Sequence, residues 1–274
     1  MWPEWLEGWL TPCPRPYRAL GYLHELLGIR RRHRRWRRAW AAHCQRSREL
    51  LLRAADRCPT QRKAVVFGSG WLYDVPLAEL AARFREVVLV DVIHPRATRR
   101  AAAHLGNVTL LQADITGTAE AVWRVARCPG LPLPQAPAPE LFVADAEVDL
   151  AASVNLLSQL PCMPEEYLLR RGTHSREAVA DYARAVVTAH LDYLRRLPGV
   201  VAVVADVESL VVEITGKVRS RASTLWGVPF PWRGQEWTWP LVPVQPTFRV
   251  EGYHLRVIGV EDVKEAERGL SGQA

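Results

Sequence analysis

The chain alternates short apolar runs with segments in which apolar residues recur every three or four positions. The first run, Lys63–Phe67, is rich in β-branched residues and stops at the glycine turn of residues 68–70. Val75–Arg85 then keeps apolar residues at helical spacing, and short runs follow at Val87–Val90 and Val108–Ala113. This alternation of strands and amphipathic helices predicts a doubly wound, mostly parallel sheet.

The second half of the chain continues the pattern. Val148–Val154 predicts a fourth strand, Ser175–Leu197 a long helix, and Val200–Ala205 a fifth strand that finishes at Asp206. Between this strand and the C-terminus, Thr224–Pro240 carries four tryptophans among prolines and glycines and predicts a loop. Such a loop either walls a ligand pocket or forms a small satellite core.

Two acidic residues follow the second and third strands. Asp91 lies twenty-one residues after Gly70, where a βαβ unit places an acid that accepts from both ribose hydroxyls. Asp114 ends the third run. Ligands of doubly wound sheets bind outside the carboxyl ends of the strands, so Gly68, Gly70, Asp91 and Asp114 are expected to line one crevice. A nucleoside-shaped ligand is implied.

The glycine turn and these two acids resemble the pattern of the class I S-adenosyl-L-methionine (SAM)-dependent methyltransferase family. The resemblance implies that Gly68, Ser69 and Gly70 face the amino-acid part of SAM. It further implies that Asp91 holds the ribose and that Asp114 accepts from the adenine amino group. A nicotinamide-binding domain would want a third glycine at position 73, which is Tyr73.

The resemblance also implies the fold class. We expect an α/β fold with a doubly wound, mostly parallel seven-stranded sheet, closed by a terminal antiparallel strand pair and preceded by an N-terminal helical segment. Thr247–Val260, which alternates around Gly252, is the predicted strand pair. Residues 1–60 are expected to form a helical cap segment, and residues 61–274 the Rossmann-like SAM-binding domain.

Two positions depart from the family's pattern. The family usually carries an acid two residues before the first glycine and a third glycine two residues after the second. Val66 and Leu72 occupy these places. Asp74, just past the turn, is the residue we expect to substitute for the missing acid.

Methyl transfer from a sulfonium is an in-line displacement that depends on near-attack geometry and, for some acceptors, on a base. In the family the segment after strand four borders the substrate, and here that segment begins at Asn155. We name Asn155, His174 and Tyr73 as candidate catalytic residues near the acceptor. The Asp/Asn-Pro-Pro-aromatic motif of nucleic-acid base amino-methylation is absent, since Leu156 follows Asn155.

The N-terminal segment combines an apolar stripe with many arginines. From Tyr22 onward, apolar and aromatic residues recur at helical spacing, while arginines fill the other faces over Arg30–Arg38. We expect this helix to be a lid over the crevice, and a nucleic-acid contact through the arginines is possible but not favoured. Residues 1–20, rich in proline and tryptophan, predict an irregular arm.

Composition narrows the class of protein. With 274 residues, 49% of them hydrophobic, the chain can form one large α/β domain with an appendage. The net charge of +7 comes from residues 1–62, which hold 14 arginines against 5 acids. The five scattered cysteines predict reduced thiols and no metal site. Without a membrane-length apolar run or a signal-peptide layout, we expect a cytoplasmic protein.

The function expected from these features is methyl transfer from SAM to a small-molecule acceptor. Two alternatives stay open. One is another SAM reaction in the same crevice, such as aminocarboxypropyl transfer, with Val66 and Leu72 reflecting a re-aimed methionine tail. The other is an RNA- or protein-directed methyltransferase, or a SAM-fold binding module, that contacts its partner through Arg30–Arg38.

Overall fold

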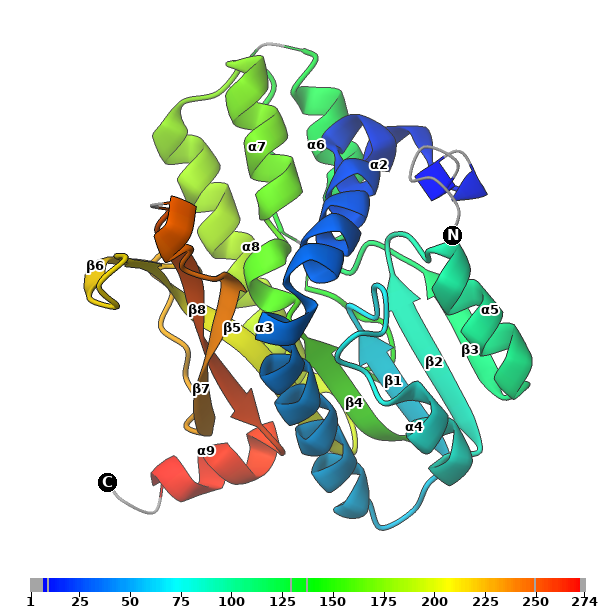
Figure 1. Ribbon diagram of the computed structural model, residues 1–274. Helices are drawn as coiled ribbons and strands as arrows, with labels where there is room; N and C mark the ends of the chain where they lie inside the picture. Colours follow the sequence, from blue (N-terminus) through cyan, green and yellow to red (C-terminus); the bar gives the residue numbers. More distant parts are fainter. Residues whose placement is uncertain (1–6, 9, 129, 137, 249, 272–274) are drawn as a thin grey trace.

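The centre of the molecule is a mixed β-sheet with the strand order β3-β2-β1-β4-β5-β8-β7, and β6 pairs with β5 beside it (Figure 1). This computed structural model describes residues 7, 8, 10–128, 130–136, 138–248 and 250–271. The strands are β1 (Lys63–Phe67), β2 (Glu86–Asp91), β3 (Val108–Gln112), β4 (Val148–Val154), β5 (Val200–Val212), β6 (Val218–Ser223), β7 (Gln235–Val242) and β8 (Gly252–Val260).

Helices connect and cover these strands. They are α2 (Arg15–Leu20), α3 (Tyr22–Asp56), α4 (Leu77–Arg83), α5 (Arg96–Leu105), α6 (Ala119–Val125), α7 (Cys162–Arg171), α8 (Arg176–Arg196) and α9 (Val263–Ser271), with short 3-10 turns η1 (Leu157–Gln159) and η2 (Pro246–Phe248). None of the helices in the described part of the chain is long and apolar enough to cross a membrane.

The predicted fold class is confirmed. β1 to β5 pair in parallel, and β8 lies antiparallel between β5 and β7. The long helix before β1 is α3, which has 35 residues and a kink where Trp36 leaves helical backbone angles (φ −115°, ψ 22°). The antiparallel strand β6 is an addition to the seven strands expected.

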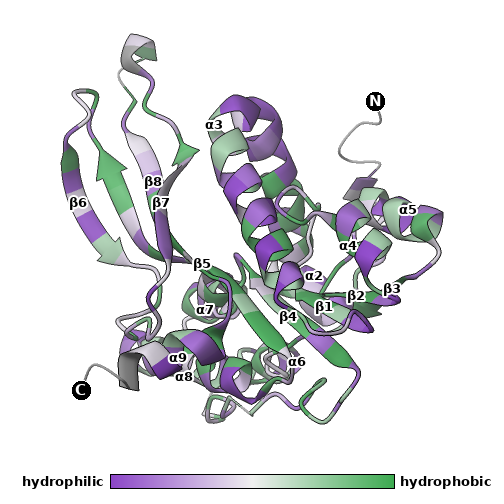
Figure 2. Ribbon diagram, turned by 90° about the horizontal axis from the view of Figure 1, so that it is seen from below, coloured by the Kyte–Doolittle hydropathy of each residue, from purple (hydrophilic) through white to green (hydrophobic). Residues whose placement is uncertain are grey.

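β5 is longer than the predicted strand Val200–Ala205. It runs for 13 residues, and its register against β8 shifts between Asp206 and Glu208, so the strand carries a bulge there. Beyond the bulge, β5 pairs with both β6 and β8. The second half of β5 together with β6, β7 and β8, called the wing below, extends from the parallel part of the sheet on the same side as α3 (Figure 2).

The predicted antiparallel strand pair is formed by other residues than expected. β8 begins only at Gly252, and the preceding Pro246–Phe248 is a 3-10 turn. Its partner β7 begins within the segment Thr224–Pro240 and extends to Val242. The prediction that this whole segment is a loop is therefore wrong. Buried Trp237 and Trp239 alternate with exposed neighbours there, and an edge strand tolerates Pro240.

The arm predicted at residues 1–20 is also partly wrong. Residues 15–20 form α2, which begins after Pro14 and ends at Gly21, whose φ of 103° separates α2 from α3. The first residues of the predicted arm, including Trp2 and Trp5, lie outside the described residues.

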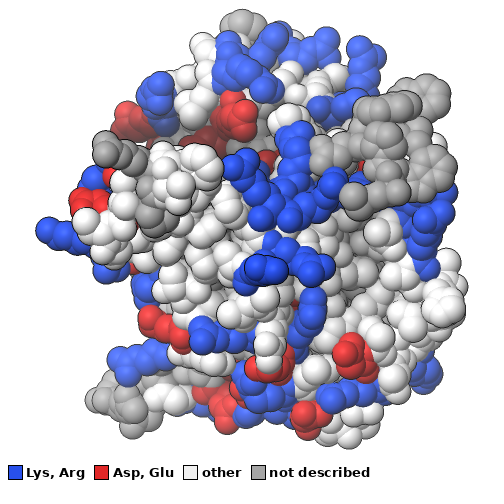
Figure 3. All heavy atoms as spheres, in the orientation of Figure 1, with Lys and Arg blue, Asp and Glu red and all other residues white. Residues whose placement is uncertain are grey.

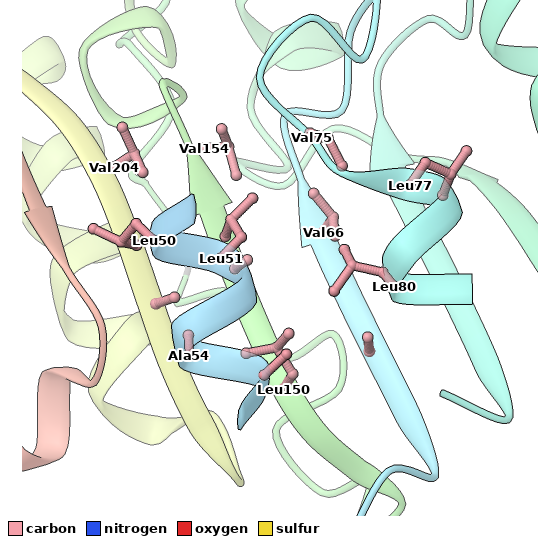
Figure 4. Packing of buried hydrophobic residues seen from close by; sticks show 14 of the residues in the cluster. Leu50, Leu51, Ala54, Val66, Val75, Leu77, Leu80, Leu150, Val154 and Val204 are labelled. Carbon is pink, nitrogen blue, oxygen red and sulfur yellow. The ribbon is translucent and has the colours of Figure 1, made fainter. Parts of the chain in front are cut away.

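Two apolar layers cover the parallel strands. In β1, Ala64 and Val66 belong to the cluster with α3 and α4, whereas Val65 and Phe67 belong to the cluster with α8, as the two-residue period of a strand requires. On the first side, Leu50, Leu51 and Ala54 of α3 lie against β4 and its neighbours (Figure 4). The C-terminal half of α3 is therefore part of the core. The domain boundary between residues 60 and 61 stays a prediction.

Candidate functional site

A cavity of about 670 Å³ opens at the carboxyl ends of the parallel strands. The turn after β1, the ends of β2 and β3 and the loop after β4 form one side of it, and α3, the start of α7, the wing and the segment after β6 form the rest. All six residues predicted to bind SAM line it, namely Gly68, Ser69, Gly70, Asp74, Asp91 and Asp114. Its volume is in the range of small-molecule sites.

The two glycines of the turn differ in what surrounds them. Gly68 has a φ of 77°, and a Cβ there would lie 2.8 Å from the carbonyl oxygen of Val154. Gly70 has a φ of 43°, but a Cβ there would meet no atom within 4 Å. Gly68 is thus needed for packing against the β4 exit, while Gly70 leaves open space beside the cavity. Between them Ser69 is buried, and its hydroxyl has no hydrogen-bond partner in the described structure.

Asp91 joins the end of β2 to the glycine turn. Its Oδ2 accepts from the Gly70 backbone N–H at 2.8 Å, and its Oδ1 accepts from the Ile93 N–H at 3.4 Å. Burial raises the pKa of this carboxyl, while the backbone donors oppose the shift. Each carboxylate oxygen can take a further bond, so Asp91 can still accept from two hydroxyls.

Asp114 has a structural task in addition to lining the cavity. Its Oδ1 accepts from the backbone N–H and the hydroxyl of Thr116 at 2.9 and 2.7 Å, and its Oδ2 accepts from the Ala119 N–H at 2.9 Å. Asp114 therefore holds the turn that opens α6. Its contact with an adenine stays a prediction.

The two departures from the family's pattern have different structural outcomes. Val66 is fully buried between β2 and β4, so this position has joined the core. Leu72 has a φ of 61°, in the left-handed region that favours glycine. The turn thus keeps a glycine-like backbone at the position of the family's third glycine, although a leucine stands there.

Two of the three candidate catalytic residues line the cavity. Asn155, with a φ of 47°, follows β4, and Tyr73 stacks on His33 with 3.6 Å between ring centroids. Burial raises the pKa of Tyr73 to about 12, so its hydroxyl stays protonated. His174 lies between α7 and α8, outside the cavity lining, where its Nε2 is 2.9 Å from the Leu131 carbonyl oxygen.

A chain of polar contacts joins α3 and the wing strand β7 to the turn after β1 and the loop after β4. The indole N–H of Trp237 donates to His43 Nδ1 at 3.0 Å. The Asn155 amide nitrogen lies 3.1 Å from His43 Nε2 and 2.5 Å from Asp74 Oδ2. The His43 ring also stacks on Trp239 with 3.9 Å between centroids.

The donors in this chain fix where its protons lie. Burial lowers the pKa of His43 to about 3, so the ring is neutral, and because Nδ1 accepts from Trp237 its proton is on Nε2. That N–H needs an acceptor, which the Asn155 amide supplies when its oxygen, not its nitrogen, faces Nε2. The same oxygen then lies 2.5 Å from Asp74, a distance that suits a protonated carboxyl. Burial also raises the pKa of Asp74, which likewise favours its protonated form.

His43 and Trp237 were not predicted as site residues. Both fit the apolar patterns of their segments, and only the packing of α3 against β7 brings them to Asn155. Asp206 was noted only as the end of strand five, and it too lines the cavity. No group of three or more potential metal ligands occurs among the described residues.

The arginines of α3 mostly face away from the cavity. In Figure 3, Lys and Arg side chains gather along the course of α3. Arg31, Arg34, Arg35, Arg37 and Arg38 are exposed, whereas Arg32 lines the cavity and pairs with Glu25. Arg30 pairs with Glu7 and lies over the Trp71 ring.

No protein-family model matches the chain, and no curated protein matches it. Solved structures of methyltransferases are similar to it. The N-methyltransferase NodS of Bradyrhizobium japonicum, in complex with S-adenosylhomocysteine, is 14% identical over 78% of this chain and 85% of its own, with a TM-score of 0.31. The 1,6-didemethyltoxoflavin-N1-methyltransferase of Burkholderia thailandensis is 11% identical over 90% and 91%, with a TM-score of 0.33.

Phosphoethanolamine N-methyltransferase 1 of Haemonchus contortus is 16% identical over 82% of this chain and 44% of its own, with a TM-score of 0.32.

Proposed function

We propose that this protein is a SAM-dependent methyltransferase that transfers the methyl group in line to a small-molecule acceptor. The observation that carries the proposal is the convergence of the Gly68–Gly70 turn, Asp91 and Asp114 on one cavity that continues past them toward the wing. SAM supplies an electrophilic methyl group on a sulfonium, so the protein has to position donor and acceptor and exclude water.

The residues present fit such a donor. The open space beside Gly70 suits the approach of a polar ligand to the backbone of the turn. Asp91 would accept from the ribose hydroxyls and Asp114 from the adenine amino group. Asp74 and Asn155 also line the cavity and contact each other, and they would border the place where donor and acceptor meet.

Aminocarboxypropyl transfer is the second candidate, and the departure at Val66 favours it. Val66 is fully buried, so the carboxylate that the family usually places near the methionine end is missing. A differently held methionine tail could expose another carbon of the sulfonium to attack. The two reactions release different products from SAM.

Product analysis tests the proposal and separates its alternatives. The purified protein is incubated with SAM and either the small-molecule or the macromolecular fraction of a cell extract, and nucleoside products are measured by mass spectrometry. We expect S-adenosylhomocysteine with the small-molecule fraction only. Methylthioadenosine would indicate aminocarboxypropyl transfer, and turnover only with the macromolecular fraction would contradict a small acceptor. The Gly70→Ala variant controls for contaminating enzymes.

A further inference from the structure

The cavity has a second part, beyond the residues assigned to the donor. Its walls include Ser158 from the loop after β4 and Asp206, Trp226, Trp239 and Tyr253 from β5 and the rest of the wing region. We call these five residues the wing compartment. The inference that follows rests on the proposed function and concerns what this compartment binds.

Asp206 is the charged side chain of the wing compartment. It lies at the β5 bulge and is only 5% exposed. A bulge re-aims a side chain that regular alternation would place elsewhere. Its Oδ1 accepts from the Ser158 hydroxyl at 2.7 Å, and no basic residue within the described parts of the chain forms an ion pair with it. A buried carboxylate without a cation is costly, and burial raises the pKa of Asp206 accordingly.

Asp149 is a second buried acid, and its hydrogen-bond partners can be compared with those of Asp206. Asp149 is 4% exposed, as buried as Asp206, but it accepts from Arg62 at 2.6 Å, from the Arg62 backbone N–H and from Thr60. These partners hold its pKa at about 2. Asp206 has one hydroxyl in place of this set, so its missing partner is expected from a ligand.

The charges around the cavity favour a cation. The acidic residues in its lining are Glu25, Asp74, Asp91, Asp114 and Asp206, and the one basic residue is Arg32, so that four acids remain against one base even with Asp74 protonated. The one base, Arg32, already pairs with Glu25. The acidic lining is the reverse of the whole chain, which carries +7. Such a low-dielectric acidic cavity concentrates positively charged ligands.

Aromatic side chains line the same cavity as Asp206. Trp226 and Trp239 belong to the compartment, and the Trp239 indole N–H is buried without a hydrogen-bond partner in the described structure. Trp226 is held in place by its N–H, which donates to Glu165 at 3.0 Å. Indole faces bind apolar groups and also attract cations. One face of Trp239 already stacks on His43, so its remaining surface and Trp226 are the aromatic walls left to a ligand. A cavity that combines a carboxylate with such walls suits an aromatic or apolar body that carries a basic nitrogen.

We propose that the acceptor is a small primary or secondary amine, bound through its nitrogen to the Asp206 carboxylate with its apolar body against Trp226 and Trp239. Asp206 takes a proton from the bound ammonium and frees the nitrogen lone pair. The nitrogen then forms a bond to the methyl carbon of SAM, the carbon–sulfur bond breaks, and its electron pair stays on sulfur. The products are the N-methylated ammonium, S-adenosylhomocysteine and the proton on Asp206, which passes to water.

Binding of three matched probes tests this proposal without any turnover. Phenethylamine, 2-phenylethanol and 3-phenylpropionate are titrated into protein saturated with S-adenosylhomocysteine, and the heats are measured. We expect the amine to bind at least about tenfold more tightly than the alcohol, and the carboxylate not to bind. Asp206→Asn should weaken amine binding about 10- to 100-fold and leave alcohol binding unchanged, because only the charge-assisted bond is lost.

Glu208→Gln is the matched control. It removes a carboxylate from the same strand, but Glu208 pairs with Arg221 and Arg256 and lies outside the cavity lining. This variant should bind the amine as the wild type does. If Asp206→Asn does not fold, the proposal is tested by the order of the wild-type protein's affinities for the three probes.

Equal binding of amine and alcohol, absence of amine binding, or unchanged amine affinity in Asp206→Asn would overturn the proposal. So would a loss of S-adenosylhomocysteine affinity in Asp206→Asn, since the carboxylate would then serve the donor. The donor titration precedes the amine titration. A wild-type protein that fails to bind S-adenosylhomocysteine contradicts the proposed function itself, whereas failure with the amine alone leaves that function standing.

Discussion

At the residue scale, Gly68 and Gly70 lie in one turn but are required for different reasons. Gly68→Ala would push a Cβ to 2.8 Å from the Val154 carbonyl oxygen in a left-handed backbone. We expect it to lower the free energy of unfolding by roughly 2–4 kcal/mol. Gly70→Ala adds backbone strain of about 1 kcal/mol, because φ is positive there. It adds no steric clash, because a Cβ would meet no atom within 4 Å.

The pair therefore separates folding from binding. Gly70→Ala should weaken S-adenosylhomocysteine binding about tenfold or more, since its methyl group would occupy the space proposed for the ligand. Denaturant unfolding and calorimetry on both variants check this. A stable Gly68→Ala protein, or a Gly70→Ala protein with unchanged affinity, would show that the turn does not have these roles.

His43 gives a prediction for the effect of pH. Its folded-state pKa is about 3, below the ordinary value of 6.5, so between these values the unfolded chain binds more protons. The contribution of neutral His43 to stability is full above about pH 6.5 and is lost as the pH falls toward 3. Lowering the pH from 7 to 5 should therefore cost the wild type more unfolding free energy than it costs His43→Gln.

Nitrogen NMR of the histidine rings tests the same assignment directly. At pH 5 the His43 ring should give the neutral pattern with its proton on Nε2, because Nδ1 accepts from Trp237. A proton on Nδ1, or a charged ring at pH 5, would contradict the hydrogen-bond chain through Asn155 to Asp74.

The residues of the glycine and acid motif could be located from the sequence, and their neighbours in the cavity could not. Glycine spacing and the acids after β2 and β3 led to Gly68, Gly70, Asp91 and Asp114, which the structure brings to one cavity. His43 contacts Asn155 across 112 residues of sequence, and no local pattern records such a contact. The stripe that contains His43 is equally typical of a helix packed in a core.

At the scale of elements, α3 both covers the cavity and closes the core. Trp40 is 3% exposed, its indole N–H donates to the Leu241 carbonyl at 3.0 Å, and its ring meets Trp239 edge to face. Trp40→Ala should lower the free energy of unfolding by about 3–5 kcal/mol and disturb ligand binding. Denaturant unfolding measures the first effect and calorimetry with S-adenosylhomocysteine the second.

Arg38→Glu is the matched control on the same helix, because Arg38 is exposed. It should change stability by no more than about 0.5 kcal/mol and leave donor binding intact. If Arg37→Glu and Arg38→Glu together abolish turnover while fold and donor binding survive, the lid interpretation fails. Salt-dependent retention on nucleic acid would then make a polyanionic partner the better explanation.

Elements of the parallel sheet could be predicted more easily than those of the wing. β1, β2 and β4 are almost entirely buried, so their continuous apolar runs stand out in the sequence. β6 has only exposed or partly buried residues, and β7 contains Pro240 and lies at the sheet edge. Such strands depend on pairing with β5 and β8, which the local sequence does not reveal.

At the scale of the whole molecule, the charge distribution has two parts. The chain carries +7, and many arginines lie on the outer face of α3, while the Asp, Glu and Arg residues that line the cavity beneath that helix are acids except for Arg32. The basic surface of Figure 3 is therefore not the surface that a bound ligand meets. The sequence favoured a lid over a nucleic-acid contact for this helix, and in the structure α3 lines the cavity while Arg31, Arg34, Arg35, Arg37 and Arg38 are exposed.

The central claim is that the cavity binds SAM, and calorimetric titration with S-adenosylhomocysteine tests it most directly. We expect saturable heat below about 1 mM ligand for the wild type and for Asp181→Ala, whose exposed carboxylate pairs with Arg184 on α8. Asp91→Ala should bind about tenfold more weakly or worse, because it strands two ribose hydroxyls at roughly 1–3 kcal/mol each. Asp114→Ala should lose less affinity. No heat from the wild type at millimolar ligand, or equal affinities for Asp91→Ala and the wild type, would contradict the account.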